Sequence, residues 1–239
     1  PSEALKKLEM ILDLLEARRN LFVSPVVFVS LATLQWAYEI EGWRKKHGAR
    51  IDGWMEALAQ FEALSSLASL AWENPEYGWP SLEPGGFGLE ADDLGHPLLD
   101  EQCVGNDIRL RDVGLWMVSG SNMSGKSSLL RALGCNVVLA MAGGPVRARR
   151  LHMEPLRPGA SIQLSDSLAG GISRFYAEIL RLRQIVEMAS QQPRLLFLLD
   201  EIMAGTNSHD RRIGAAAIIR SLVQQKALGL VTTHDLALT

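Results

Sequence analysis

The stretch "GSNMSGKSSLLR" at residues 120–131 has two glycines separated by four residues, followed by Lys126 and Ser127. The preceding residues, "VGLWMVS" at 113–119, have the apolar pattern of a strand, and the residues from Lys126 onward have that of a helix. This order of strand, glycine loop and helix is the context in which the G-x-x-x-x-G-K-[ST] motif binds phosphate. The loop N–H groups and the positive end of the helix would then surround phosphate oxygens.

The loop therefore predicts a binding site for ATP with Mg²⁺ as its metal ion. Lys126 is expected to reach the β and γ phosphates, and the Ser127 hydroxyl to hold Mg²⁺. The residues expected to bind the nucleotide along this loop are Gly120, Ser121, Asn122, Met123, Ser124, Gly125, Lys126, Ser127 and Ser128.

A second candidate site follows an apolar run, "RLLFLLDEI" at 194–202, which ends in two carboxylates. Buried carboxylates are costly unless they lie at the open edge of a sheet. Asp200 is expected to orient Mg²⁺ and its waters. Glu201 is expected to act as the general base that polarises an attacking water. If this acid pair stood alone, a strand end that meets solvent would be the alternative explanation. Because a phosphate loop lies upstream, a catalytic role is favoured.

Two further stretches carry candidate polar groups. "LGLVTTHD" at 228–235 places His234 at a strand end, where it could sense the γ-phosphate or the attacking water. "SLAGGISRFYAEILRLRQIVEMA" at 167–189 places Ser173 at the start of a long amphipathic helix, which is a second anion-binding position. A structural histidine and an ordinary helix cap are the respective alternatives.

The pattern of elements predicts an α/β fold. Short apolar runs alternate with amphipathic helices after residue 95, as in a P-loop NTPase sheet of the ABC-type ATPase kind with flanking helices. Helical spacing dominates residues 1–75, so an all-α region is expected first. The Pro- and Gly-rich range 76–94 is predicted to be a linker, and 95–239 a P-loop ATPase domain. The chain lacks an initial Met and stops after a strand-like run, so we expect a fragment whose last domain is truncated.

Composition adds few constraints on partners. The formal net charge of -3 gives no overall basic surface for nucleic acid. The two cysteines have no metal-binding spacing and no secretory leader is present, which favours a cytoplasmic location.

Residues 21–37 carry no charge over nearly the length of a membrane span. Pro25 and Gln35 interrupt this stretch, so a buried helix is favoured and a membrane segment is the alternative.

Together these stretches resemble the MutS family of DNA mismatch-repair ATPases over residues 95–239. "GSNMSGKSS" resembles the family loop G-P-N-M-G-G-K-S-T, "DEIMAGTNSHD" resembles D-E-I-G-R-G-T-S-T-x-D, and "TTHDLALT" resembles A-T-H-Y-x-x-L. "GISRFYAEI" resembles the signature stretch, which has S-T-F and then an acid. "GHPLL" at 95–99 and "GND" at 105–107 resemble R-H-P-hydrophobic and P-N-D.

The resemblance implies ATP hydrolysis at the interface of a homodimer that forms through the ATPase domains. Ser173 matches the signature serine that reaches the γ-phosphate of the partner subunit. Asn122 matches the loop asparagine at the phosphates, and His234 matches the switch-like histidine. Residues 1–75 resemble a remnant of the core or lever region. Mismatched or branched DNA is then the expected further partner, bound through regions outside this chain.

Four positions depart from the family pattern. Cys103 stands where members commonly have an aromatic residue that stacks on adenine, and Ser121 replaces the loop proline. Arg174 replaces the signature threonine, and Arg211 replaces a glycine. These differences predict a divergent MutS-like protein.

Two alternatives use similar residues. "LAGGIS" at 168–173 is similar to the L-S-G-G-Q signature of ABC ATPases in transporters and chromosome-maintenance complexes. The second alternative is a scaffold protein that is gated by nucleotide binding and has little ATP turnover.

Overall fold

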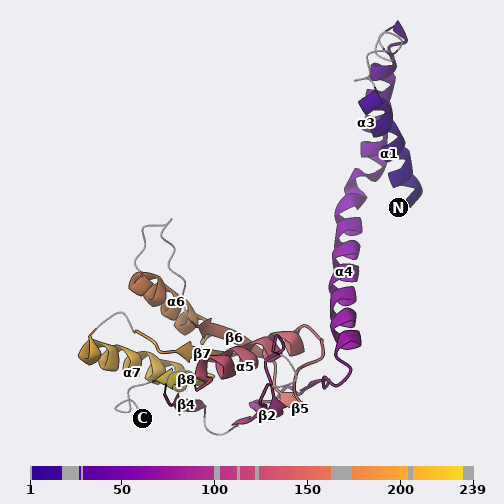
Figure 1. Cartoon of the computed structure of the whole chain (residues 1–239). Helices are drawn as coiled ribbons and strands as arrows, with labels where there is room; N and C mark the ends of the chain where they lie inside the picture. The colour runs from indigo at the N-terminus through magenta and orange to yellow at the C-terminus, as the bar shows by residue number, and fades with distance from the viewer. Residues whose placement is uncertain are drawn as a thin grey trace. The chain divides into compact units, whose positions relative to one another are not determined.

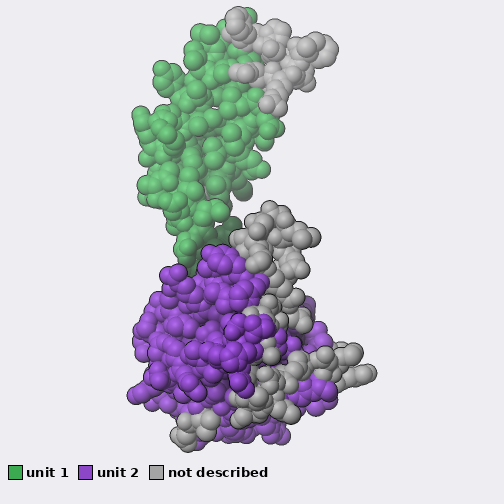
Figure 2. Space-filling view, turned by 90° about the vertical axis from the view of Figure 1, so that its left-hand side faces the viewer, with its two compact units in different colours: residues 1–66 green, residues 67–239 purple. Residues whose placement is uncertain are grey.

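The computed structural model describes residues 2–17, 27, 29–99, 103–111, 114–121, 124–162, 174–203 and 207–233. The chain divides into two compact units, Pro1–Ser66 and Leu67–Thr239. Figure 1 traces the elements of each unit, and Figure 2 shows the two units in different colours.

All regular elements described in the first unit are helices. They are α1 (Ser2–Ala17), α3 (Ala32–His47), the 3-10 turn η1 (Gly48–Arg50) and α4 (Ile51–Glu73), which continues into the second unit. Trp43 of α3 is buried, and its indole N–H donates to the Ala4 carbonyl at 2.7 Å. Lys7 and Glu39 form an ion pair at 2.8 Å. These two contacts hold α1 against α3.

The uncharged stretch at 21–37 lies partly outside the described residues. Where it is described, α3 begins at Ala32 and Val27 is buried. Over the described part of the chain, no helix is both long and apolar enough to cross a membrane.

The second unit contains two four-stranded sheets. The first has the order β1-β5-β2-β3, with β2 antiparallel to β5 and β3, and β1 parallel to β5. Its strands are β1 (Ser81–Leu82), β2 (Leu89–Leu94), β3 (Asn106–Leu110) and β5 (Arg150–Met153). The second sheet has the order β4-β8-β7-β6 and all its neighbours are parallel. Its strands are β4 (Leu115–Ser119), β6 (Leu156–Ser161), β7 (Arg194–Asp200) and β8 (Leu228–Thr233).

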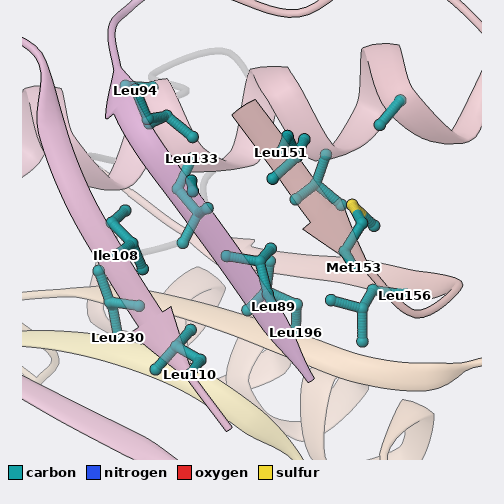
Figure 3. Packing of buried hydrophobic residues seen from close by; sticks show 14 of the residues in the cluster. Leu89, Leu94, Ile108, Leu110, Leu133, Leu151, Met153, Leu156, Leu196 and Leu230 are labelled. Atoms are coloured by element: carbon teal, nitrogen blue, oxygen red, sulfur yellow. The ribbon is translucent and has the colours of Figure 1, made fainter. Parts of the chain in front are cut away.

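Helices cover both faces of the parallel sheet, as the sequence predicts. They are α5 (Lys126–Met141), α6 (Arg174–Met188) and α7 (Ser208–Gln224). Side chains of β7 alternate between two cores because successive residues of a strand point to opposite faces. Leu196 and Leu198 join the cluster formed by α5 and the first sheet, whereas Phe197 joins the cluster of α6 and α7. Figure 3 shows part of the first cluster, which contains Leu133 of α5 together with side chains of both sheets.

The first sheet corrects the linker predicted over 76–94. β2 lies in this range, and Leu89, Ala91 and Leu94 are fully buried in the core. The Pro- and Gly-rich residues lie just before the strand, where Gly85 and Gly86 have positive φ. Such backbone conformations suit glycine. Local composition therefore marked a turn that leads into a core strand.

Candidate nucleotide-binding site

The glycine loop connects β4 to α5 in the order predicted from the sequence. Gly125 precedes the first residue of α5 and has a φ of 87°, a left-handed conformation that glycine adopts without steric cost. A Cβ on Gly120 would lie 3.1 Å from the Ser124 hydroxyl oxygen, so the loop closes tightly on itself. The N–H groups of the first turn of α5 have no partner within the helix, which favours an anion at this end.

Lys126 occupies the inside of this loop. It is only 6% exposed, and its ammonium donates to the carbonyl oxygens of Gly120 at 2.9 Å and Ser121 at 2.8 Å. A buried ammonium requires such acceptors because desolvation of an uncompensated charge is unfavourable. Phosphate oxygens are stronger, charged acceptors than amide carbonyls, so they can replace these contacts.

A pocket of about 630 Å³ opens above the loop. This volume lies within the usual range for small-molecule and cofactor sites. One wall consists of Gly120, Ser121, Ser124, Gly125, Lys126 and Ser128. The opposite wall comes from the segment between β2 and β3 and the start of β3, and it includes His96, Leu99, Cys103, Val104 and Asn106. Ser127 is half-buried in the first turn of α5 and is not one of the lining residues.

Of this wall, only Cys103 was given a role from the sequence; the stretches at 95–99 and 105–107 were matched to the family without being assigned to the site. Asn136 of α5 is fully buried and fixes this wall: its amide donates to the Gly95 carbonyl at 2.8 Å and accepts the Arg147 N–H at 2.7 Å. Gly95 in turn donates its N–H to the Arg147 carbonyl at 2.8 Å. Tyr77 lies nearby, and burial raises the pKa of its phenol. For Asn136 itself, the sequence signal was a polar residue within an apolar stretch of α5.

The acid pair lies at the same edge of the parallel sheet as the loop. Asp200 is the last residue of β7 and is paired with Thr232 of β8, while Ser119 at the end of β4 is paired with Thr233. Since β8 is the only strand between them and neighbouring strands lie ~4.8 Å apart, the ends of β4 and β7 are about 10 Å apart. This is the edge where parallel sheets bind ligands.

Thr232 contacts both residues of the pair. Its hydroxyl donates to Asp200 Oδ1 at 2.5 Å and accepts the Glu201 N–H at 3.1 Å. The Glu201 side chain is exposed, and its backbone has a φ of 49°. Thr232 was not predicted from the sequence, where its signal was a polar side chain near the end of an apolar strand.

The turn after the acid pair is held by two helices. Met203 also has a positive φ of 59°. Its N–H donates to Glu178 Oε1 of α6 at 2.5 Å, and its carbonyl accepts from Arg211 Nε of α7 at 3.2 Å. Arg211, which departs from the family pattern, therefore supports this turn.

Four candidate residues lie outside the described residues, namely Asn122, Met123, Ser173 and His234.

The donors at this edge suit a magnesium ion accompanied by a nucleotide. Within the described ranges no group of three or more His, Cys, Asp or Glu could hold a metal. Mg²⁺ at phosphate sites takes one or two protein carboxylates and completes its shell with phosphate oxygens and waters. The Asp200 carboxylate and the Ser127 hydroxyl are both oxygen donors of the kind that Mg²⁺ prefers.

A parallel sheet, a glycine loop at the start of a helix and an acid pair on a nearby strand end define an α/β domain of the nucleotide-binding class. Residues 116–239 match the family of MutS domain V. The chain belongs to the MutS family. The resemblance seen in the motifs is thus confirmed for the family, and the transporter-type alternative loses its support.

Proposed function

We propose that this chain binds and hydrolyses ATP as the ATPase domain of a divergent MutS-like protein. The observation that carries the proposal is Lys126, which is buried inside a glycine loop at the sheet edge shared with Asp200 and Glu201. The two carbonyl partners of Lys126 are neutral, so the charged oxygens of a phosphate can replace them.

Each residue then has a distinct role. The loop N–H groups and Lys126 bind the phosphates, and the oxygens of Ser127 and Asp200 hold Mg²⁺. Bound Mg²⁺ neutralises charge that develops on the phosphate oxygens. Glu201 accepts a proton from the water that attacks the γ-phosphorus, and ADP and phosphate leave. We assign the sensing of the γ-phosphate to His234 by its motif.

The chemistry is tested by two substitutions. Glu201→Gln removes the base but keeps the side-chain shape, so ATP binding is retained and turnover falls by ~10²–10⁴-fold. Lys126→Ala removes a phosphate ligand, so binding itself is lost. Both are measured by nucleotide binding and by phosphate release. Turnover of Glu201→Gln within a factor of two of wild type would place the base elsewhere.

We further propose, from the resemblance of the signature stretch, a homodimer in which each ATP lies between two subunits. A second set of donors is needed on the open side of the γ-phosphate, and Ser173 of the partner is the proposed donor. Ser173→Ala and Lys126→Ala chains, each nearly inactive alone, are expected to regain activity when mixed, because the mixed dimer contains one complete site. If the mixture forms dimers but regains no ATPase activity, Ser173 acts in the site of its own chain or has no role in catalysis.

Coupling to DNA is the last part of the proposal, and its support is the membership of a mismatch-repair family. ATP turnover of the full-length protein should be compared without DNA and with homoduplex, mismatched and branched DNA. A rate that is the same under all four conditions would separate this protein from DNA repair. Cys103, Ser121, Arg174 and Arg211 support the status of a divergent member.

A further inference from the structure

Thr232 is a buried polar residue that follows the apolar part of β8. It is 1% exposed and lies on β8 between Val118 of β4 and Asp200 of β7. Burying a hydroxyl without hydrogen bonds is unfavourable. Its neighbours along β8, Leu230 and Val231, pack in the two apolar cores. The hydroxyl therefore lies at a buried position where an aliphatic side chain would match its apolar neighbours on β8.

The two partners of this hydroxyl fix the direction of its proton. A hydroxyl has one hydrogen to donate and lone pairs to accept. The Glu201 N–H can only donate, at 3.1 Å from Oγ1. The Thr232 hydrogen is thus free to point to Asp200 Oδ1, which lies 2.5 Å away and accepts it. One lone pair of Oδ1 is used in this way, and the rest of the carboxylate stays available as an oxygen donor.

Thr232 also holds the peptide that joins the two acids. The Glu201 N–H contacts the Thr232 carbonyl oxygen at 3.2 Å as well as Oγ1. Glu201 has a φ of 49°, and residues other than glycine keep such a conformation only where surrounding contacts impose it. One residue of the neighbouring strand therefore contacts both acids, through the Asp200 carboxylate and the Glu201 N–H.

We infer that Thr232 is a positioning residue that orients Asp200 as an oxygen donor and fixes the backbone turn that presents Glu201. This rests on the proposed function of the site. The family motif A-T-H has alanine at the position of Thr232, so the hydroxyl contact belongs to this chain and not to the motif.

The test compares Thr232→Val, which keeps the shape without the hydroxyl, with Thr232→Ser, which keeps the hydroxyl. Affinity for a fluorescent non-hydrolysable ATP analogue is measured in the full chain with Mg²⁺ and with EDTA. Turnover is measured in parallel, and thermal unfolding without nucleotide serves as a folding control.

Thr232→Val is expected to bind the analogue in EDTA within about twofold of wild type, because Lys126 and the loop are untouched. The ratio of the affinity with Mg²⁺ to the affinity in EDTA should fall about 10- to 100-fold, since a hydrogen bond to a charged group is lost. The kcat should fall by a similar factor. Thr232→Ser should restore both. Should Thr232→Val unfold, Thr232→Ala gives the same comparison with the residue of the family motif.

A hydroxyl-free variant with wild-type Mg²⁺ dependence and kcat would overturn the inference. A serine variant as poor as the valine variant would also overturn it, because packing and not the hydroxyl would then be responsible. A wild-type chain that binds the analogue but does not turn over ATP would overturn hydrolysis alone, and the Mg²⁺ comparison would still decide the role toward Asp200. A wild-type chain that binds no nucleotide would overturn both.

Discussion

Replacing Asn136 with leucine removes the connection between α5 and the wall of the pocket opposite the glycine loop. The side chain is fully buried and makes three hydrogen bonds, to Gly95, Ala132 and Arg147. Leucine has a side chain of similar length and branching and fits a helix, so the change removes the polar contacts while the position stays filled.

The expected destabilisation follows from the groups left behind. The Ala132 carbonyl is within α5, where the helix's own backbone supplies a donor. The Gly95 carbonyl and the Arg147 N–H lose the Asn136 amide. A buried polar group without its partner costs ~1–3 kcal/mol, so Asn136→Leu should destabilise the second unit by about 2–6 kcal/mol.

Hydrogen exchange of the β7 backbone amides measures this change, because strand amides in the core open only with the whole cooperative unit. Asn74→Leu is a matched control. It loses a single side-chain bond to the Leu70 carbonyl, which also accepts the Asn74 backbone N–H, so its effect should stay near ~1 kcal/mol. An Asn136→Leu effect no larger than this control would refute the reasoning.

Two further changes test the packing and the pocket. A Cβ on Gly229 of β8 would lie 2.4 Å from the Phe197 carbonyl oxygen and from its ring. Gly229→Ala should therefore destabilise the chain by ~1–3 kcal/mol in a thermal or urea titration. An unchanged midpoint would contradict this packing. With Cys103 in place of a stacking aromatic, the chain should bind ATP and GTP with more similar affinity than with an aromatic there, because a contact of up to about 1 kcal/mol is missing. Cys103→Phe should raise the preference for ATP, and a strong preference that survives Cys103→Ala would show that other residues read the base.

The parallel sheet could be predicted from the sequence because its strands are locally distinct. β7 and β8 are continuous apolar runs, as expected for strands covered on both faces. The first sheet was not predicted because β2 carries three carboxylates in six residues. Asp92 is nevertheless stable there, since the Arg109 guanidinium donates to it and holds the pKa of its carboxyl below the usual value. That partner lies on another strand, so no local pattern could reveal it.

The candidate site divides in the same way. The glycine loop and the acid pair are contiguous in the sequence, so their chemistry could be predicted from residue types and spacing. Thr232 and Asn136 act through hydrogen bonds to segments about 30 to 40 residues away. Whether a threonine on a strand or an asparagine on a helix makes such a contact depends on which strands are neighbours, and the sequence alone did not give that order.

The structure ties the two halves of the site to different elements. α5 begins with Lys126 and, about three turns further on, carries Asn136, so one helix anchors both the loop and the opposite wall of the pocket. β8 carries Thr232 and contacts the acid pair instead. Because a rigid helix cannot change the distance between its own residues, changes in α5 should alter nucleotide affinity through both walls together. If the proposed function holds, changes at Thr232 should alter metal dependence and turnover while metal-free binding persists, so the two halves of the site can be tested separately.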